Sequence, residues 1–106
     1  PPSRTARFPR LPRVAQASSR EVTIVNRLGL HARPAMELVD TATSFACDVR
    51  VRRSDGNEWV NGKSIMEMML LAATKGTKLV VEAEGDDAEK ALDTIAALVA
   101  KGFNED

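Results

Sequence analysis

Residues 21–45 read EVTIVNRLGLHARPAMELVDTATSF, and this stretch changes from an alternating to a helical pattern. Val22 and Ile24 lie on one side of the alternation, which predicts a short strand followed by a turn. Pro34 stands where the first turn of a helix tolerates proline best. Apolar residues then recur at helical spacing and predict a helix over about 32–45; they are Ala35, Leu38, Val39, Ala42 and Phe45.

A hairpin is predicted next. Val49 and Val51 alternate with charged side chains, as in a strand that buries one face. Residues 54–57, Ser-Asp-Gly-Asn, have the composition of a hairpin turn, and a short third strand follows at about 58–61. We expect the charged face of this hairpin to be solvated.

The rest of the chain predicts a helix, a strand and a helix. Ser64 and Glu67 form a capping box, which predicts a second helix of about ten residues that ends at Lys75 and Gly76. Apolar residues alternate with others in a fourth strand at 79–83. Acidic residues then cap a third helix, whose expected buried face consists of Leu92, Ile95, Leu98, Val99 and Phe103.

The element order is therefore β-α-β-β-α-β-α, with short strands and tight connections. It predicts the α+β class, with a small antiparallel sheet covered on one side by helices. A ferredoxin-like α+β sandwich shares most of this order, so fold class alone does not indicate a function. We expect one domain over 21–106, preceded by a disordered extension over 1–20 that is rich in Pro and Arg.

Composition excludes several functional classes. The first 20 residues hold five Arg and no acid, so the other 86 residues, with ten basic and fifteen acidic side chains, have a net charge of −5. Such a domain is a poor nucleic-acid binder. One Cys and one His exclude a disulfide framework and a zinc cluster, and they point to a reducing compartment. No segment approaches the roughly 18 apolar residues of a membrane span.

The single histidine, His31, directly precedes the predicted first helix. The start of a helix exposes unpaired N–H groups and the positive end of its dipole, which bind anions and favour an uncharged imidazole. Such a ring can attack a phosphoryl group, and Arg33 would add a guanidinium to the same oxygens. Alternatively, His31 caps the helix and Arg33 is an unrelated surface residue. The residues alone leave both interpretations open.

The second predicted helix offers two more features. Gly62-Lys63-Ser64 resembles the end of a phosphate-binding P-loop, but Asn57 stands where that motif requires glycine, so Ser64 is better explained as a helix cap. This helix is rich in apolar residues, and four of the five residues from 65 to 69 are apolar. They either overfill the core or leave flexible methionines on a surface that binds partners.

Four blocks of sequence together resemble the HPr family, the histidine-containing phosphocarriers of the bacterial phosphotransferase system. They are NRLGLHARPA at 26–35, NGKSIM at 61–66, ATKGT at 73–77 and EGDDA at 84–88. The resemblance runs from about Glu21 to the end of the chain. It implies an open-faced β-sandwich with a four-stranded antiparallel sheet in the order 1-4-2-3 under three helices. It also implies a cytoplasmic, monomeric and stoichiometric phosphoryl carrier, without cofactor or metal, rather than an independent enzyme.

The resemblance assigns roles to individual residues. His31 would receive a phosphoryl group on Nδ1 from phosphorylated enzyme I and pass it to an enzyme IIA domain, with Arg33 stabilising the phosphohistidine. Ser64 falls on the serine that a dedicated HPr kinase/phosphorylase modifies in many members. The surface that docks partners would consist of Ala32, Ile65, Met66 and Met69.

The branch of the phosphotransferase system stays open. Sugar transport and nitrogen regulation use the same chemistry, and the ending at 102–106, GFNED, is similar to nitrogen-branch relatives. The context of Ser64 resembles regulated members, in which phosphorylation supports a corepressor role with a transcriptional regulator. Arg52 and Arg53, in the segment before Ser64, depart from the commonest pattern of the family.

Overall fold

The computed structural model describes residues 17–105. Four strands form one antiparallel sheet in the order β1-β4-β2-β3, as predicted. The elements in chain order are β1 (Ala17–Thr23), α2 (Ala32–Thr43), β2 (Asp48–Arg53), β3 (Val60–Asn61), α3 (Ile65–Met69), β4 (Lys78–Glu84), α4 (Ala88–Ala100) and the 3-10 turn η2 (Gly102–Asn104). No helix in this part of the chain is long and apolar enough to cross a membrane.

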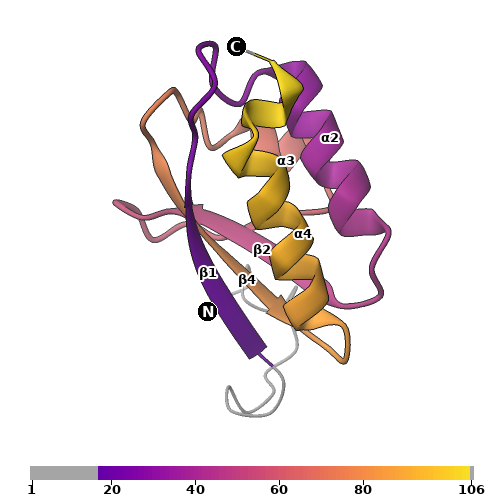
Figure 1. Cartoon of the computed structure of the whole chain (residues 1–106). Coiled ribbons are helices and arrows are strands. Elements are labelled where there is room, and N and C mark those ends of the chain that lie inside the picture. The colour runs from indigo at the N-terminus through magenta and orange to yellow at the C-terminus, as the bar shows by residue number, and fades with distance from the viewer. Residues whose placement is uncertain (1–16, 106) are drawn as a thin grey trace.

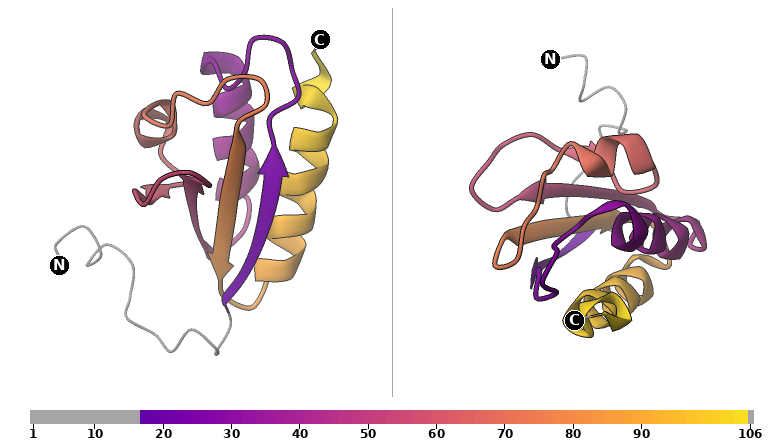
Figure 2. Two further views of the ribbon diagram at one scale, coloured as in Figure 1. Left: turned by 90° about the vertical axis from the view of Figure 1, so that its left-hand side faces the viewer. Right: turned by 90° about the horizontal axis from the view of Figure 1, so that it is seen from above.

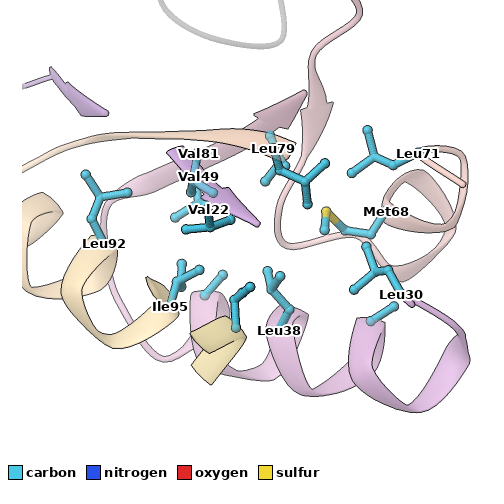
Figure 3. Close-up of a cluster of buried hydrophobic side chains, with 14 of the residues drawn as sticks. Val22, Leu30, Leu38, Val49, Met68, Leu71, Leu79, Val81, Leu92 and Ile95 are labelled. Carbon is cyan, nitrogen blue, oxygen red and sulfur yellow. The ribbon is translucent and has the colours of Figure 1, made fainter. Parts of the chain in front are cut away.

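Helices α2 and α4 lie side by side over one face of the sheet, and the short α3 packs beside α2 (Figures 1 and 2). The core fills the space between these layers (Figure 3). Because strand residues alternate between faces, every second side chain of β1, β2 and β4 points toward the helices. The largest core side chains include Ile24, Leu38, Val49, Met68, Leu79, Val81, Leu92 and Ile95.

The first strand begins earlier than the sequence predicts. β1 starts at Ala17, which pairs with Glu84 of β4, so residues 17–20 belong to the folded domain and not to the expected extension. Arg20 strengthens this part of the strand through an ion pair with Asp93 of α4, at 2.5 Å. The remainder of the predicted extension, 1–16, lies outside the described residues.

The sequence predicts a solvated charged face on the hairpin, but part of this face is buried. Arg50 lies opposite Glu82 in the β2–β4 register, and its side chain is 6% exposed. Its guanidinium donates to Glu82 Oε1 and Glu84 Oε1, both at 2.6 Å, and Trp59 lies over it. Buried charges are tolerated where they are paired in this way. The prediction of a fully solvated face, made from the alternation of residue types, is therefore wrong at Arg50.

Helix α3 has five residues rather than about ten. It ends at Met69, and Ala72, three residues later, adopts the left-handed conformation with φ +49°. Lys75 and Gly76, the predicted helix end, instead form the turn into β4, where the Gly76 N–H donates to Ile24 O at 2.7 Å. The left-handed residue explains the early end, since a right-handed helix cannot continue through it.

Cys47 and Asp87 connect the start of β2 to the start of α4. Asp87 occupies the N-cap of α4, but its carboxylate caps no N–H of that helix and accepts from the Ala46 and Cys47 N–H groups at 2.8 and 3.0 Å. The Cys47 side chain is buried, and this burial raises the pKa of its thiol to about 11, with the Asp87 carboxylate acting in the same direction.

Candidate functional site

His31 stands at the N-cap of α2 in an extended conformation. Its carbonyl accepts the first helical hydrogen bond, from Ala35 N at 3.0 Å. The N–H groups of Ala32 and Arg33 belong to the first turn, where a helix offers no carbonyl partner, and Pro34 has no N–H. The start of α2 therefore presents two backbone donors next to the imidazole.

The loop before His31 is held tightly against the loop that precedes β4. Leu30 N donates to Ala73 O at 2.8 Å. Gly29 has φ +70°, and a Cβ on it would lie 2.6 Å from Ala73 O, which is too close for any side chain. Glycine is thus required at 29 both for its backbone conformation and for this close approach, which fixes the position of the histidine two residues later.

The C-terminal segment turns back onto His31. Phe103 lies beyond the end of α4, and not on its face as predicted, because three successive residues adopt positive φ, at 65°, 57° and 61°. These residues are Gly102, Phe103 and Asn104. Phe103 is buried, and the described chain ends at Glu105 beside the start of α2 (Figure 1).

Glu105 follows this turn and contacts the histidine directly. Its Oε1 atom lies 2.9 Å from His31 Nε2 and 3.0 Å from Nδ2 of the buried Asn26. The hydrogen bond from His31 is the main cause that holds the pKa of Glu105 below its usual 4.5, and Asn26 and the charge of Arg33 act in the same direction against desolvation. Glu105 is therefore a carboxylate at neutral pH and can only accept hydrogen bonds.

This geometry determines what the imidazole can do. With a carboxylate at Nε2, the neutral ring carries its proton there, and its lone pair is on Nδ1. Within residues 17–105, Nδ1 receives no hydrogen bond. A nucleophilic nitrogen next to the donors of a helix start can accept and hold an anionic group.

The other predicted site residues lie on two helices. Ala32 and Arg33 are exposed in the first turn of α2. On α3, Met66 is 78% and Met69 41% exposed, while Ile65 packs partly against the core. Met68 is fully buried. The methionine-rich helix therefore serves both the core and an apolar surface, which the sequence had posed as alternatives.

Ser64 is the N-cap of α3, as the capping box predicts. Its Oγ accepts from Glu67 N at 3.2 Å. The Glu67 carboxylate accepts from Asn61 N at 2.9 Å, and Ser64 N donates to Asn61 O at 3.1 Å, so Asn61 takes part in the cap. The hydroxyl lies at the start of a helix whose next turn carries exposed methionines.

Sequence reasoning missed Asn26 and Glu105. Asn26 is part of the first block that resembles the family, and Glu105 belongs to the GFNED ending, yet no local pattern places the two side chains together. No group of three or more His, Cys, Asp or Glu side chains across residues 17–105 is arranged to hold a metal.

Comparison with known proteins identifies the family. Residues 18–101 match the family model described as "PTS HPr component phosphorylation site". The chain belongs to the HPr family. Its His31 and the α2 start therefore lie in a domain of bacterial phosphotransferase-system phosphocarriers, and the resemblance noted in the sequence is confirmed.

Similar proteins of the HPr family carry two names. The phosphocarrier protein HPr of Pseudomonas aeruginosa is 46% identical over 85 residues, which are 80% of this chain and 93% of that protein. The phosphocarrier protein NPr of Proteus mirabilis is 42% identical over 87 residues, 82% of this chain and 96% of its own. A crystal structure of HPr from Thermoanaerobacter tengcongensis superposes with a TM-score of 0.79 at 38% identity and covers 84% of this chain and 98% of that one. The HPr fold is confirmed.

Proposed function

We propose that this phosphocarrier accepts its phosphoryl group on His31 Nδ1 from phosphorylated enzyme I and passes it to an enzyme IIA domain. The observation that carries the proposal is the pairing of His31 Nε2 with Glu105, which leaves the Nδ1 lone pair for attack at the start of α2. The proposal places the exchange in the cytoplasm, with the chain acting as a monomer.

The transfer needs no cofactor. The Nδ1 lone pair forms a bond to phosphorus while the bond from phosphorus to the donor nitrogen breaks, and its electron pair stays with the donor. The oxygens of the transferred group then meet the N–H groups of Ala32 and Arg33. The Arg33 guanidinium adds a charge-assisted hydrogen bond to the same oxygens.

The exposed apolar side chains of α3 support the docking role. Met66 and Met69, with Leu70 at 75% exposure, form an exposed apolar surface that does not contribute to the core. Unbranched methionines adapt to differently shaped partners, as a carrier that meets both a donor and an acceptor requires. In the proposal, Ala32 and Ile65 complete this docking surface.

Regulation through Ser64 is a further part of the proposal. The half-buried hydroxyl lies at the N-cap of α3, where a phosphate would meet free N–H groups and the positive end of the helix dipole. The same phosphate would place negative charge beside Met66 on the docking surface. We propose that HPr kinase/phosphorylase adds it, and that a basic transcriptional regulator then binds.

The two branches share this chemistry, and relatives named HPr and NPr match with similar identity. We therefore propose the carrier function without assigning a branch. The preference for one enzyme I over the other distinguishes the two branches. Parallel assays with enzyme I of the sugar branch and of the nitrogen branch, at equal concentrations, measure which donor charges the chain faster.

The central test uses the purified chain, phosphoenolpyruvate, Mg²⁺ and enzyme I. We expect one phosphate per chain, labile in acid and stable in base as a phosphohistidine is. His31→Ala should take up none and keep the wild-type unfolding curve, because the half-exposed ring adds little to the core. Ser64→Ala is the matched control and should be charged normally. Acid-labile phosphate on His31→Ala would disprove the assignment.

A further inference from the structure

We infer that Glu105 is a positioning residue for His31. Its carboxylate keeps the ring proton on Nε2 before transfer and stabilises the positive ring charge that develops while Nδ1 takes the phosphoryl group. The kinetic half of this inference rests on the proposed function. The half that concerns the proton can be measured on the unphosphorylated protein.

Two donors fix the orientation of the carboxylate. His31 Nε2 and Asn26 Nδ2 both contact the same oxygen, Oε1, at 2.9 and 3.0 Å. Asn26 is 1% exposed, and its amide also donates to Gly29 O at 2.7 Å in the loop before the histidine. The carboxylate is therefore tied to the loop that carries His31 and not only to the ring.

The backbone before Glu105 is built for this contact. Phe103 and Asn104 adopt positive φ although neither is glycine, a conformation that persists only where the surroundings require it. The buried side chain of Phe103 anchors the turn, and Glu105 N donates to Gly102 O at 3.0 Å. A chain that simply continued α4 would carry Glu105 away from the ring, so the strained turn is what delivers it.

The carboxylate acts on both states of the ring. In the neutral imidazole it selects the tautomer protonated on Nε2, which leaves the lone pair on Nδ1. As that pair forms the new nitrogen–phosphorus bond and the donor's bond breaks, the ring gains a positive charge and keeps its Nε2 proton. A carboxylate in this place stabilises the cation without taking the proton, as in a Ser-His-Asp triad.

Arg33 is the other charged group that acts on this carboxylate, and its charge also lowers the pKa of Glu105. Removing the negative charge of Glu105 therefore leaves His31 with a nearby guanidinium and no counter-charge. We expect Glu105→Gln to move the ring proton from Nε2 toward Nδ1, because an amide at this place can donate to Nε2 as well as accept from it.

The test is a ¹⁵N NMR titration of the His31 ring in the wild type, in Glu105→Gln and in the control Glu89→Gln. Glu89 is an exposed carboxylate in the first turn of α4, at the opposite end of that helix from Glu105, and it accepts one side-chain hydrogen bond, from Ser18. Glu105→Gln should reduce the fraction of the neutral ring that is protonated on Nε2, and the control should leave it unchanged. Unchanged ring signals in Glu105→Gln would overturn the inference.

The rate of charging by enzyme I tests the second half. We expect a roughly three- to tenfold slower transfer in Glu105→Gln, because a hydrogen bond between the ring and a charged carboxylate is replaced by a weaker one to a neutral amide. Altered ring signals with an unchanged rate would reject the charge-stabilising role. If the wild type itself took no phosphate, the proposed function would fail, while the NMR result would still decide the role of Glu105.

Discussion

The Nη1 atom of Arg53 donates a hydrogen bond to the carbonyl oxygen of Leu71, 3.1 Å away, and so joins the end of β2 to the chain just after α3. The same atom reaches Ala72 O at 3.3 Å, at the residue whose positive φ ends the helical turn. Because α3 carries the docking surface and has only five residues, this contact from a neighbouring strand holds its C-terminal end.

Replacing Arg53 by Ala should weaken docking and spare the chemistry. The variant loses the two hydrogen bonds to the chain after α3, worth about 0.5–1.5 kcal/mol each, together with an exposed ion pair to Asp55. We therefore expect the KM for phosphorylated enzyme I to rise roughly two- to tenfold with little change in kcat. Arg52→Ala removes a neighbouring guanidinium that contacts hairpin carbonyls instead. An equal rise of KM in both variants would mean that net charge, not the contact with α3, is responsible.

Arg33→Ala should slow transfer and not abolish it. The backbone N–H groups at the start of α2 remain, and the lost charge-assisted bond is worth about 1.5–3 kcal/mol, or roughly tenfold to a hundredfold in rate. Lys should restore only part, since it lacks the planar guanidinium. Rapid-quench measurement of His31 charging provides the rate. Arg27→Ala, an exposed arginine in the loop before His31, is the control, and equal effects in the two variants would deny Arg33 a specific role.

Phosphorylation of Ser64 should reduce acceptance from enzyme I without unfolding the domain. A charge of about −1.5 to −2 at a helix N-cap favours the helix, but it repels an acidic partner from the apolar surface beside Met66. We expect slower His31 charging in the phosphorylated protein, a partial effect in Ser64→Asp and little in Ser64→Ala. An unchanged melting temperature is expected with the slower rate, and a large drop in it would contradict the capping geometry.

Arg50→Ala should be among the most destabilising single substitutions on the sheet. It leaves the carboxylates of Glu82 and Glu84 buried without their shared guanidinium, a change that costs about 3–5 kcal/mol in comparable buried pairs. Urea unfolding measures it, with the more exposed Arg52→Ala as control. The triple replacement of all three residues by apolar side chains should recover part of the loss; if it is no more stable than Arg50→Ala, the buried carboxylate charges are not the cause.

Asp87 should make stability depend on pH in the acid range. Hydrogen bonds from Ala46 N, and then from Cys47, lower the pKa of Asp87 below its usual 3.8. The folded state therefore binds this proton less readily than the unfolded state, so the stabilisation is present above pH 3.8 and is lost as the pH falls through the lower folded value. Asp87→Asn should flatten this part of the acid-unfolding profile, which circular dichroism follows. An identical profile in both proteins would contradict the assignment.

Local sequence patterns predicted the site residues whose positions depend on neighbouring sequence. The change of period within 21–45 places His31 and Arg33 at a helix start, and the capping box places Ser64 at another. The contact between His31 and Glu105 spans 74 positions and depends on three left-handed residues, which no periodicity reveals. Alternation likewise shows that Arg50 faces away from the core, but not that two carboxylates on β4 enclose it.

The reactivity of the buried Cys47 thiol reports local opening of the structure around it. Only the thiolate reacts with alkylating reagents, and a buried thiol with a pKa of about 11 is almost entirely protonated at neutral pH. The α-carbon of Gly85 also lies so near that a Cβ on it would be 2.8 Å from the Cβ of Cys47. Labelling of this single thiol therefore requires β2 to separate from the start of α4, and the labelling rate measures how often this end of the sheet opens.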